Sequence, residues 1–271
     1  MKTVIVVTTV FCLFFTFIAS TAGRSLVPAK EYGKVILTDH STKALFPPAR
    51  FDHWLHRAFF TCRLCHVDLG FAMQQNGTKV TAEANAHKLY CGSCHNGKTK
   101  HFGRPIFESC SSEYSSEEKS RCRRCHYSEE EAERTFTYDT FARRFPKLKT
   151  GNLVDWERTE ALGFIQPLDA LPDSPPRRPP LKAQPDFSIT SRGTWIADII
   201  FSHQKHAVWN GCEVCHPEIF PSVKKGATRY SMFQISEGEY CGACHGSVAF
   251  PVEECQRCHK AKTSTAPPKG K

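Results

Sequence analysis

The chain has 271 residues and a formal net charge of +9, and 40% of its residues are apolar. Sixteen glycines and seventeen prolines interrupt regular structure so often that they argue against a protein-only hydrophobic core of normal size. Fourteen cysteines are the next feature to explain, because cysteine spacing distinguishes disulfide frameworks, metal sites and cofactor attachment.

The N-terminus has the features of a secretory signal peptide over residues 1–22. Lys2 supplies the positive charge, Val4 to Ile18 form an apolar run, and Ser20 to Ala22 offer a small-residue cleavage site. The run is short for a membrane-spanning helix, and an uncleaved anchor is the alternative. No later stretch is long and apolar enough to cross a bilayer. We therefore expect an exported chain that is periplasmic, extracellular or associated with the outer membrane.

The pattern Cys-x-x-Cys-His occurs six times and uses twelve of the fourteen cysteines. It is the attachment site of c-type haem, in which two thiols add to the vinyl groups of one porphyrin and the adjacent imidazole ligates the iron. Zinc sites and disulfides also use paired cysteines, but neither needs a histidine after every second cysteine. We therefore predict six covalently bound haems. The attachment residues are Cys62, Cys65, Cys91, Cys94, Cys122, Cys125, Cys212, Cys215, Cys241, Cys244, Cys255 and Cys258, and the proximal ligands are His66, His95, His126, His216, His245 and His259.

Haem also changes the meaning of the positive charge. Two propionates on each haem would outweigh the charge that remains after loss of Lys2 with the signal peptide. We therefore expect no nucleic-acid partner. The basic residues are expected to balance propionates, with a basic patch for an acidic redox partner as the alternative.

Two segments of the chain match at a fixed offset. Phe51 to His66 (FDHWLHRAFFTCRLCH) matches Phe201 to His216 (FSHQKHAVWNGCEVCH), and each contains Phe-x-His-x-x-His before the first haem motif. In both cases the next motif begins 29 residues after the first, with Tyr before it and Gly after its first Cys. A repeat of about 80 residues that binds three haems is therefore present twice.

The expected fold is mainly α and irregular, with two haem-cored repeats of short helices and long loops and a short strand before each His-x-x-His. The strands are predicted over Lys34 to Thr38 and Thr194 to Phe201. The domains are residues 1–22 (signal), 34–127 (first tri-haem domain), 128–193 (linker), 194–260 (second tri-haem domain) and 261–271 (disordered tail). Within the linker, Asp155 to Leu162 predicts a short amphipathic helix, and the proline-rich Leu171 to Pro185 predicts an extended spacer.

The sixth ligand of each iron decides whether that iron can bind a substrate. Seven histidines lie outside the motifs. The pairs His53/His56 and His203/His206 stand at identical distances before matching motifs, so they are the best candidates for distal ligands.

On these residues each repeat resembles the tri-haem periplasmic cytochromes of the c7 type, relatives of the tetrahaem class III cytochromes c. The resemblance rests on Phe-x-His-x-x-His, three Cys-x-x-Cys-His motifs and a His four residues before the second motif, and it covers roughly Lys34 to His126 and Thr194 to His259. It implies that the first His of each pair ligates the haem of the next motif and the second His the following haem. By position it pairs His53 with His66, His56 with His95, His87 with His126, His203 with His216, and His206 with His245.

The second repeat departs from this pattern, because Glu237 stands where the first repeat has His87. The haem of His259 therefore lacks an obvious distal histidine. Met232 is the nearest soft donor, and some members of the family use a His/Met pair at this haem. Ligation by His40 or His101 reaching across, an open iron and a structural role for Met232 are the alternatives. If Met232 ligates, this haem should have a higher potential than the other five.

Three other residues stand apart from the motifs. His101 lies six residues after His95 and could replace His87 as a ligand, whereas His40 is expected to be structural. Cys110 is the one cysteine after the signal peptide that lies outside a motif, and it predicts a buried thiol or an intermolecular disulfide.

The leading functional hypothesis is an electron carrier rather than an enzyme, because an iron ligated on both faces cannot bind a substrate. The resemblance implies respiratory transfer through closely packed low-potential haems. Its partners would be redox proteins: inner-membrane donors, and terminal reductases or outer-surface cytochromes. One alternative is a multihaem reductase that uses an open haem at His259. The other is a subunit of an extracellular conductive assembly.

Overall fold

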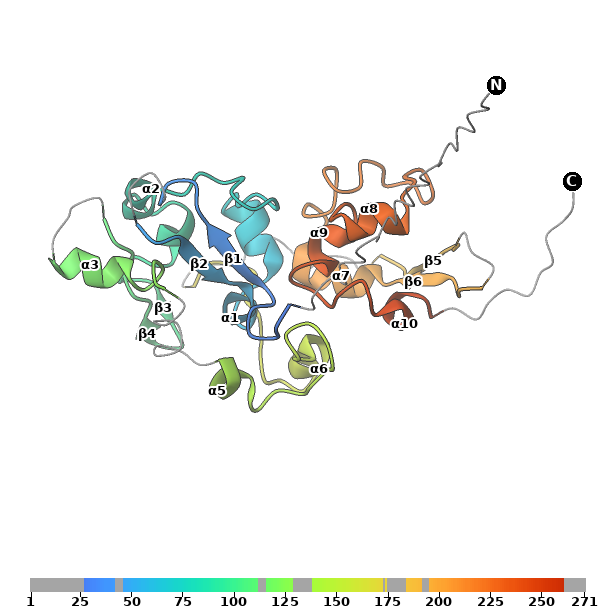
Figure 1. The fold of residues 1–271 in the computed structure, drawn as a ribbon, viewed down its shortest axis with the longest axis horizontal. Coiled ribbons are helices and arrows are strands. Elements are labelled where there is room, and N and C mark those ends of the chain that lie inside the picture. Colours follow the sequence, from blue (N-terminus) through green and yellow to red (C-terminus); the bar gives the residue numbers. More distant parts are fainter. Residues whose placement is uncertain are drawn as a thin grey trace, which may run out of the picture.

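The computed structural model describes residues 27–41, 46–111, 116–128, 138–172, 174, 184–191 and 195–260. The predicted signal peptide, most of the proline-rich spacer and the whole predicted tail lie outside these residues. The described chain consists of short helices, long loops and two-stranded sheets, as the sequence predicts (Figure 1). No helix in this part of the chain has the length and apolarity needed to cross a membrane.

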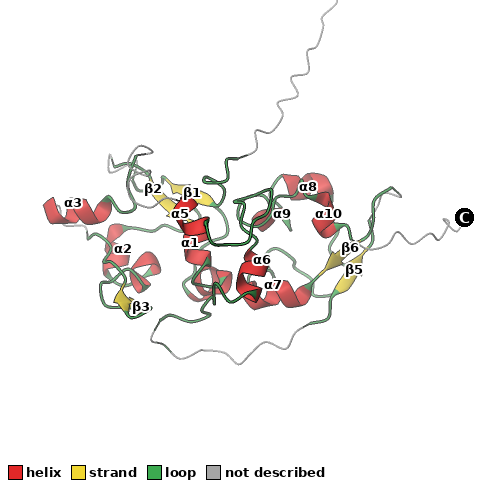
Figure 2. Cartoon of the chain, turned by 90° about the horizontal axis from the view of Figure 1, so that it is seen from below, coloured by secondary structure: helices red, strands yellow, loops and turns green. Residues whose placement is uncertain are grey.

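The elements follow the order of the two repeats, which lie side by side in two perpendicular views (Figures 1 and 2). The first repeat contains β1 (Lys34–Leu37), β2 (Ala49–Asp52), α1 (His53–Arg57), the π-helical turn η1 (Leu64–Asp68), α2 (Ala82–Ala86), the 3-10 turn η2 (Tyr90–Ser93), β3 (Lys100–His101), β4 (Arg104–Pro105) and α3 (Ser116–Cys122). Between the repeats lie α5 (Tyr138–Ala142) and α6 (Trp156–Ala161). The second repeat contains β5 (Phe187–Ile189), β6 (Ile199–Phe201), α7 (His203–Asn210), α8 (Met232–Ser236), α9 (Gly242–His245) and α10 (Cys255–Cys258).

A two-stranded antiparallel sheet leads into each His-x-x-His segment. β1 pairs with β2, and β5 pairs with β6. The predicted strand at Lys34 to Thr38 is confirmed by β1, whereas the second predicted strand is shorter than expected, because β6 begins at Ile199. The partner strands β2 and β5 were not predicted. β5 lies within the predicted linker, so the end of that linker contributes structure to the second repeat.

The duplication is visible in the helix that precedes the second motif of each repeat. α2 and α8 each follow an extended N-cap residue, Thr81 or Ser231, whose hydroxyl accepts a hydrogen bond from the helix. Shortly after each helix the chain passes so close to it that only glycine fits. A Cβ at Gly92 would lie 1.9 Å from the Asn85 carbonyl oxygen, and one at Gly242 would lie 1.8 Å from that of Ile235. This contact explains the glycine that follows the first cysteine in both second motifs.

The end of each repeat pairs with a strand near its beginning. His126, in the third motif of the first repeat, forms an antiparallel bridge with Ala49 of β2. His259 forms the matching bridge with Ile199 of β6. The last haem motif of each repeat is therefore fixed against the strand that precedes its first haem motif.

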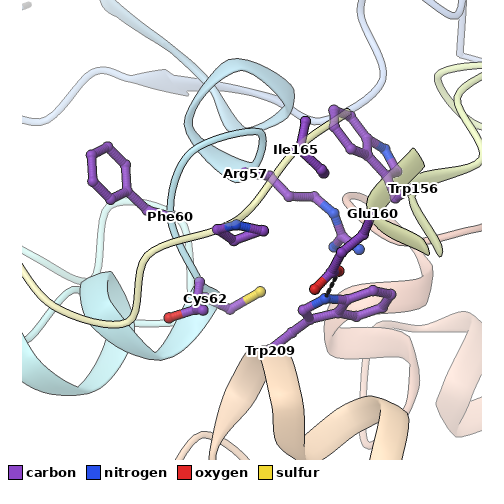
Figure 3. A pocket seen from close by; sticks show the side chains of 9 residues that line it. Arg57, Phe60, Cys62, Trp156, Glu160, Ile165 and Trp209 are labelled. Carbon is purple, nitrogen blue, oxygen red and sulfur yellow. Dashed lines mark hydrogen bonds between the residues drawn. The ribbon is translucent and has the colours of Figure 1, made fainter. Parts of the chain in front are cut away.

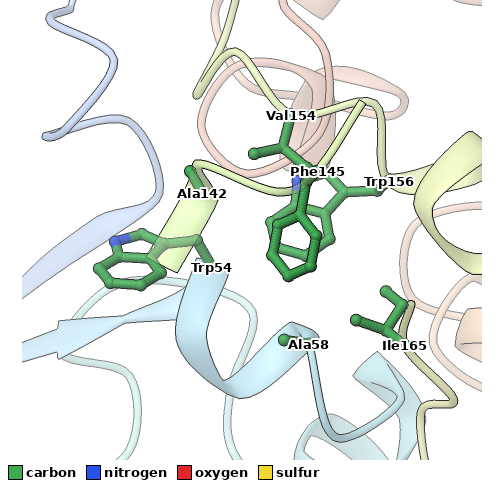
Figure 4. Packing of buried hydrophobic residues seen from close by; sticks show 7 residues of the cluster. All are labelled: Trp54, Ala58, Ala142, Phe145, Val154, Trp156 and Ile165. Carbon is green, nitrogen blue, oxygen red and sulfur yellow. The ribbon is translucent and has the colours of Figure 1, made fainter. Parts of the chain in front are cut away.

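A protein-only hydrophobic core lies between α1 and the segment that follows the first repeat (Figure 4). Its buried members are Trp54, Ala58, Ala142, Phe145, Val154, Trp156 and Ile165. Burying a large apolar side chain stabilises a fold by about 1.5–3 kcal/mol, so residues 138–165 are held firmly rather than acting as a free connection. The predicted helix at Asp155 to Leu162 is confirmed by α6, and the Asp155 side chain caps it by accepting from the Arg158 amide.

The second repeat buries far less apolar protein surface. Its buried hydrophobic side chains in the described residues are Val214 and Ile235. A repeat with so small a protein core needs another source of apolar burial for its stability, which covalently attached haem would provide.

Candidate haem-iron sites

The haem motifs lie on single helical turns. In five of them the histidine amide donates to the carbonyl of the first cysteine, four residues earlier, over 2.8–3.0 Å. The five histidines are His95, His126, His216, His245 and His259. One turn of helix places residues three and four apart on the same side of the backbone, so the two thiols and the imidazole of a motif can reach one porphyrin.

The histidines predicted as iron ligands share one hydrogen-bond pattern. In ten of the eleven, Nδ1 lies 2.6–3.3 Å from a backbone carbonyl oxygen, to which it can donate. His95 is the exception, because its buried Nδ1 meets no carbonyl oxygen with the geometry of a normal hydrogen bond. A carbonyl that accepts from Nδ1 fixes the tautomer in which Nε2 carries a free lone pair, and this is the usual outer contact of a metal-ligating histidine.

Three of the predicted distal–proximal pairs are brought together. The ring centroids are 6.4 Å apart for His53 and His66, 6.2 Å for His56 and His95, and 6.2 Å for His206 and His245. An imidazole nitrogen lies about 2 Å from a metal that it ligates, so two imidazoles on opposite faces of one iron have centroids about 6.3 Å apart. The spacing therefore matches an iron between each pair.

The six histidines of these pairs are held in their neutral form by burial. Burial lowers the pKa of His53, His95 and His245 to about 4. It also lowers the pKa of His56, His66 and His206. A buried imidazole resists protonation because the charged form loses its hydration, and the neutral form is the one that ligates metal.

A phenylalanine two residues before each His-x-x-His packs on the second histidine of the pair. The ring centroid of Phe51 lies 4.4 Å from that of His56, and that of Phe201 lies 4.5 Å from that of His206. Both phenylalanines also meet the first histidine edge-on. The repeated phenylalanine in the sequence thus orients the distal imidazoles, a role that the sequence alone did not assign.

The structure does not bring the other predicted partners together in the same way. His87 with His126, and His203 with His216, show no ring contact although all four residues are described. Met232 begins α8 with its side chain half exposed, and Glu237 follows the same helix at the position of His87. These ligand assignments remain predictions.

Two histidines outside the pairs have other surroundings. His101 packs among Phe59, Phe60 and Phe102, with a buried Nε2 that makes no hydrogen bond. The Nε2 atom of His40 lies 3.6 Å from an Asp39 carboxylate oxygen.

Cys110 pairs with Cys122 in an intramolecular disulfide, with Cα atoms 5.1 Å apart. This arrangement differs from both predictions for Cys110, the free buried thiol and the intermolecular bond. One sulfur cannot hold a disulfide and a haem thioether together, so the two bonds compete for Cys122. The assignment of Cys122 as an attachment residue therefore stays a prediction.

Comparison of this chain with known proteins identifies the family to which its sequence is similar. The model of "Cytochrome c7 and related cytochrome c" matches residues 49–127 and 199–260, together more than half of the chain. No curated protein was found to match. Among solved structures, a c7-type three-haem cytochrome domain is 37% identical over 27% of this chain and 90% of its own, with a TM-score of 0.25. The C-terminal hexahaem fragment of a dodecahaem cytochrome c is 22% identical over 84% of this chain and 96% of its own, with a TM-score of 0.24.

The family match covers all six Cys-x-x-Cys-His motifs and both His-x-x-His segments. Within these regions three of the predicted histidine pairs have the spacing of two imidazoles on one iron. This chain belongs to the cytochrome c7 and related cytochrome c family and is a multihaem cytochrome c.

Proposed function

We propose that this chain is an exported hexahaem cytochrome that carries electrons in a respiratory chain. The twelve motif cysteines would hold six c-type haems, which supply reversible one-electron chemistry at iron. The proposal extends the family assignment by the number of haems, the role and the location.

The observation that carries this proposal is the crossed pairing of histidines on α1. His53 and His56 lie three residues apart, yet their rings face the imidazoles of two different motifs, His66 and His95. One short helix would therefore cap two haem irons and fix the position of one relative to the other. An iron with imidazole on both faces has no position left for a substrate, which supports a carrier over an enzyme.

The surrounding protein groups would keep these ligands in place during repeated oxidation and reduction. The Gly33 carbonyl oxygen lies 3.1 Å from Nδ1 of His53, and the Asp52 carbonyl oxygen lies 3.0 Å from Nδ1 of His56. Backbone carbonyls do not titrate. Over a wide pH range they therefore keep the proton on Nδ1 and leave the Nε2 lone pair free to ligate iron.

The direct test is the haem content and spin state of the purified mature protein. We expect a mass equal to the mature polypeptide plus six haems, and low-spin electron paramagnetic resonance signals from the bis-histidine irons. A mass that matches the bare polypeptide would refute the proposal. So would a reduced protein in which most of the haems bind carbon monoxide.

One observation favours a second candidate function at a single haem. Glu237 stands at the end of α8 where the first repeat has His87 at the end of α2. The iron next to His259 would then be open, as a multihaem reductase requires. If Met232 ligates this iron instead, the haem carries electrons at a higher potential than the others. Carbon monoxide binding by one reduced haem in six would support the reductase, and its absence would support the carrier.

The proposed location and partners follow from the predicted signal peptide and the family. Redox proteins would exchange electrons with the haem edges: inner-membrane donors, and terminal reductases or outer-surface cytochromes. Cell fractionation with haem staining tests the location. A haem-loaded protein found in the cytoplasm with residues 1–22 intact would contradict it.

A further inference from the structure

Side-chain contacts between α6 and α7 join the segment that follows the first repeat to the second repeat. The Trp209 indole Nε1 donates to the Glu160 carboxylate over 2.5 Å, and Glu157 forms an ion pair with Lys205. Glu157 and Glu160 lie three residues apart, and Lys205 and Trp209 lie four apart, so each pair shares one face of its helix. One face of α6 therefore contacts one face of α7.

A cation reinforces this contact from the first repeat. The guanidinium of Arg57, at the end of α1, lies 4.4 Å from the ring centroid of Trp209 and 5.5 Å from that of Trp156 (Figure 3). Arginine over an indole ring is an attractive arrangement. Three elements from three parts of the chain, α1, α6 and α7, thus meet around one tryptophan.

A haem-attachment cysteine of the first repeat lies at the same place. Cys62 lines the same pocket as Arg57 and Trp209 (Figure 3). Trp209 itself lies three residues before Cys212, the first attachment cysteine of the second repeat. The first haem motifs of both repeats therefore adjoin this pocket. We call this region, formed by Arg57, Cys62 and Trp209, the junction.

Contacts on other sides fix the angle between the repeats. The Tyr32 hydroxyl donates to the Ala249 carbonyl over 2.6 Å. Arg63 is 2% exposed and passes so close to Gly211 that a Cβ there would lie 2.3 Å from its Cδ. Arg63 is itself anchored by Asp169, in the segment that follows α6.

We propose that residues 138–172 form a bracket that fixes the second repeat on the first, and that electrons cross between the two haem groups at the junction that the bracket holds closed. Glu160 and Trp209 are positioning residues in this scheme. They set the distance between the haem edges of the two repeats and ligate neither. The inference rests on the proposed electron-transfer function, but the bracket itself is a structural claim that can be tested separately.

The test uses the full-length mature haem protein and substitutions of Trp209. Trp209→Leu removes the indole from Arg57 and Glu160, and Trp209→Phe keeps a ring for Arg57 but loses the hydrogen bond. Glu160→Gln is a third variant that leaves the tryptophan in place. The matched control is Trp195→Leu, because Trp195 lies in the second repeat and is 84% exposed.

Two measurements are made on each variant: the radius of gyration by small-angle X-ray scattering, and the rate at which electrons redistribute among the haems after flash reduction. For Trp209→Leu we expect a larger radius and redistribution slowed by about tenfold, because the closed junction is then populated only part of the time. Trp209→Phe and Glu160→Gln should show smaller changes in the same direction, and Trp195→Leu should match the wild type. Haem content should be the same in all five proteins.

An unchanged radius and an unchanged rate in Trp209→Leu would overturn the proposal. If Trp209→Leu fails to fold, the other two variants decide, and wild-type values in both would overturn it. A wild-type protein without haem would refute the proposed function while leaving the scattering comparison as a valid test of the bracket. A larger radius with an unchanged rate would show that electrons do not cross at the junction.

Discussion

The imidazole rings of His53 and His66 lie parallel, with 6.4 Å between their centroids and 7° between their planes. They come from different elements, α1 and η1. Substitution of the distal member tests the pair directly. In His53→Ala one iron should lose its sixth ligand, so about one haem in six should become high-spin and bind carbon monoxide. Electron paramagnetic resonance and a carbon monoxide titration of the reduced protein measure this.

A matched histidine substitution provides the control. His40 lies beside Asp39 rather than opposite a motif histidine, so His40→Ala should keep the wild-type spectrum. A His53→Ala protein that stays fully low-spin and unreactive would show that His53 is not a ligand.

The second prediction concerns the core between α1 and α5–α6. Phe145 is 3% exposed and packs against Phe141 and Trp156. Phe145→Ala should lower the free energy of unfolding by about 3–5 kcal/mol, because it leaves a cavity in a packed cluster. Chemical denaturation followed by far-ultraviolet circular dichroism measures this change.

Phe233 is 74% exposed on α8, and Phe233→Ala should change the free energy of unfolding by less than about 0.5 kcal/mol. Equal effects of the two substitutions would mean that the bracket contributes no core of its own.

The third prediction concerns the competition for Cys122. A thioether is not reversed by thiols, whereas a disulfide is. In the haem-loaded protein Cys122 should therefore carry haem and leave Cys110 as a free thiol. Cys110 should be alkylated by iodoacetamide without reductant in the haem-loaded protein, but only after reduction in the haem-free chain. Peptide mass mapping reports both.

Cys110→Ser removes the competing bond and should retain all six haems. If Cys110 in the loaded protein resists alkylation until a reductant is added, the third haem is held through Cys125 alone.

The fourth prediction concerns the haem next to His259. Glu237→His restores the residue that the first repeat has at His87. If this iron is open in the wild type, Glu237→His should abolish carbon monoxide binding by that haem. If Met232 ligates it, Met232→His should lower the potential of the highest-potential component in a spectroscopic redox titration. An unchanged titration curve for Met232→His would exclude the thioether as ligand.

The sequence was sufficient for those parts of the fold that depend on repetition. The identical spacing of His53 and His203 from their motifs identified the candidate distal ligands. The structure places three of the five predicted histidine pairs at a distance suited to iron. The helix α6, which lies between the repeats, was predicted separately from the amphipathic pattern of Asp155 to Leu162.

The contacts that the sequence could not reveal are those between distant residues or with the backbone. Glu160 and Trp209 are 49 positions apart and meet only because the segment after the first repeat folds against α1. The acceptors for the histidine Nδ1 atoms are backbone carbonyls such as that of Phe71, which any residue type would provide. The pairing of Cys110 with Cys122 depends likewise on the path of a loop.

The bridge between Ile199 and His259 has a consequence for synthesis of the protein. His259 Nδ1 lies 2.6 Å from the carbonyl oxygen of Ala197. The start of the second repeat therefore cannot complete its contacts until His259, almost the last described residue, has been synthesised. A ribosome that stopped before codon 259 would release a chain that cannot form the bridge between Ile199 and His259. Premature termination before His259 should therefore be about as damaging to the second repeat as loss of its first motif. The first repeat should still fold, because its own bridge between Ala49 and His126 is already formed.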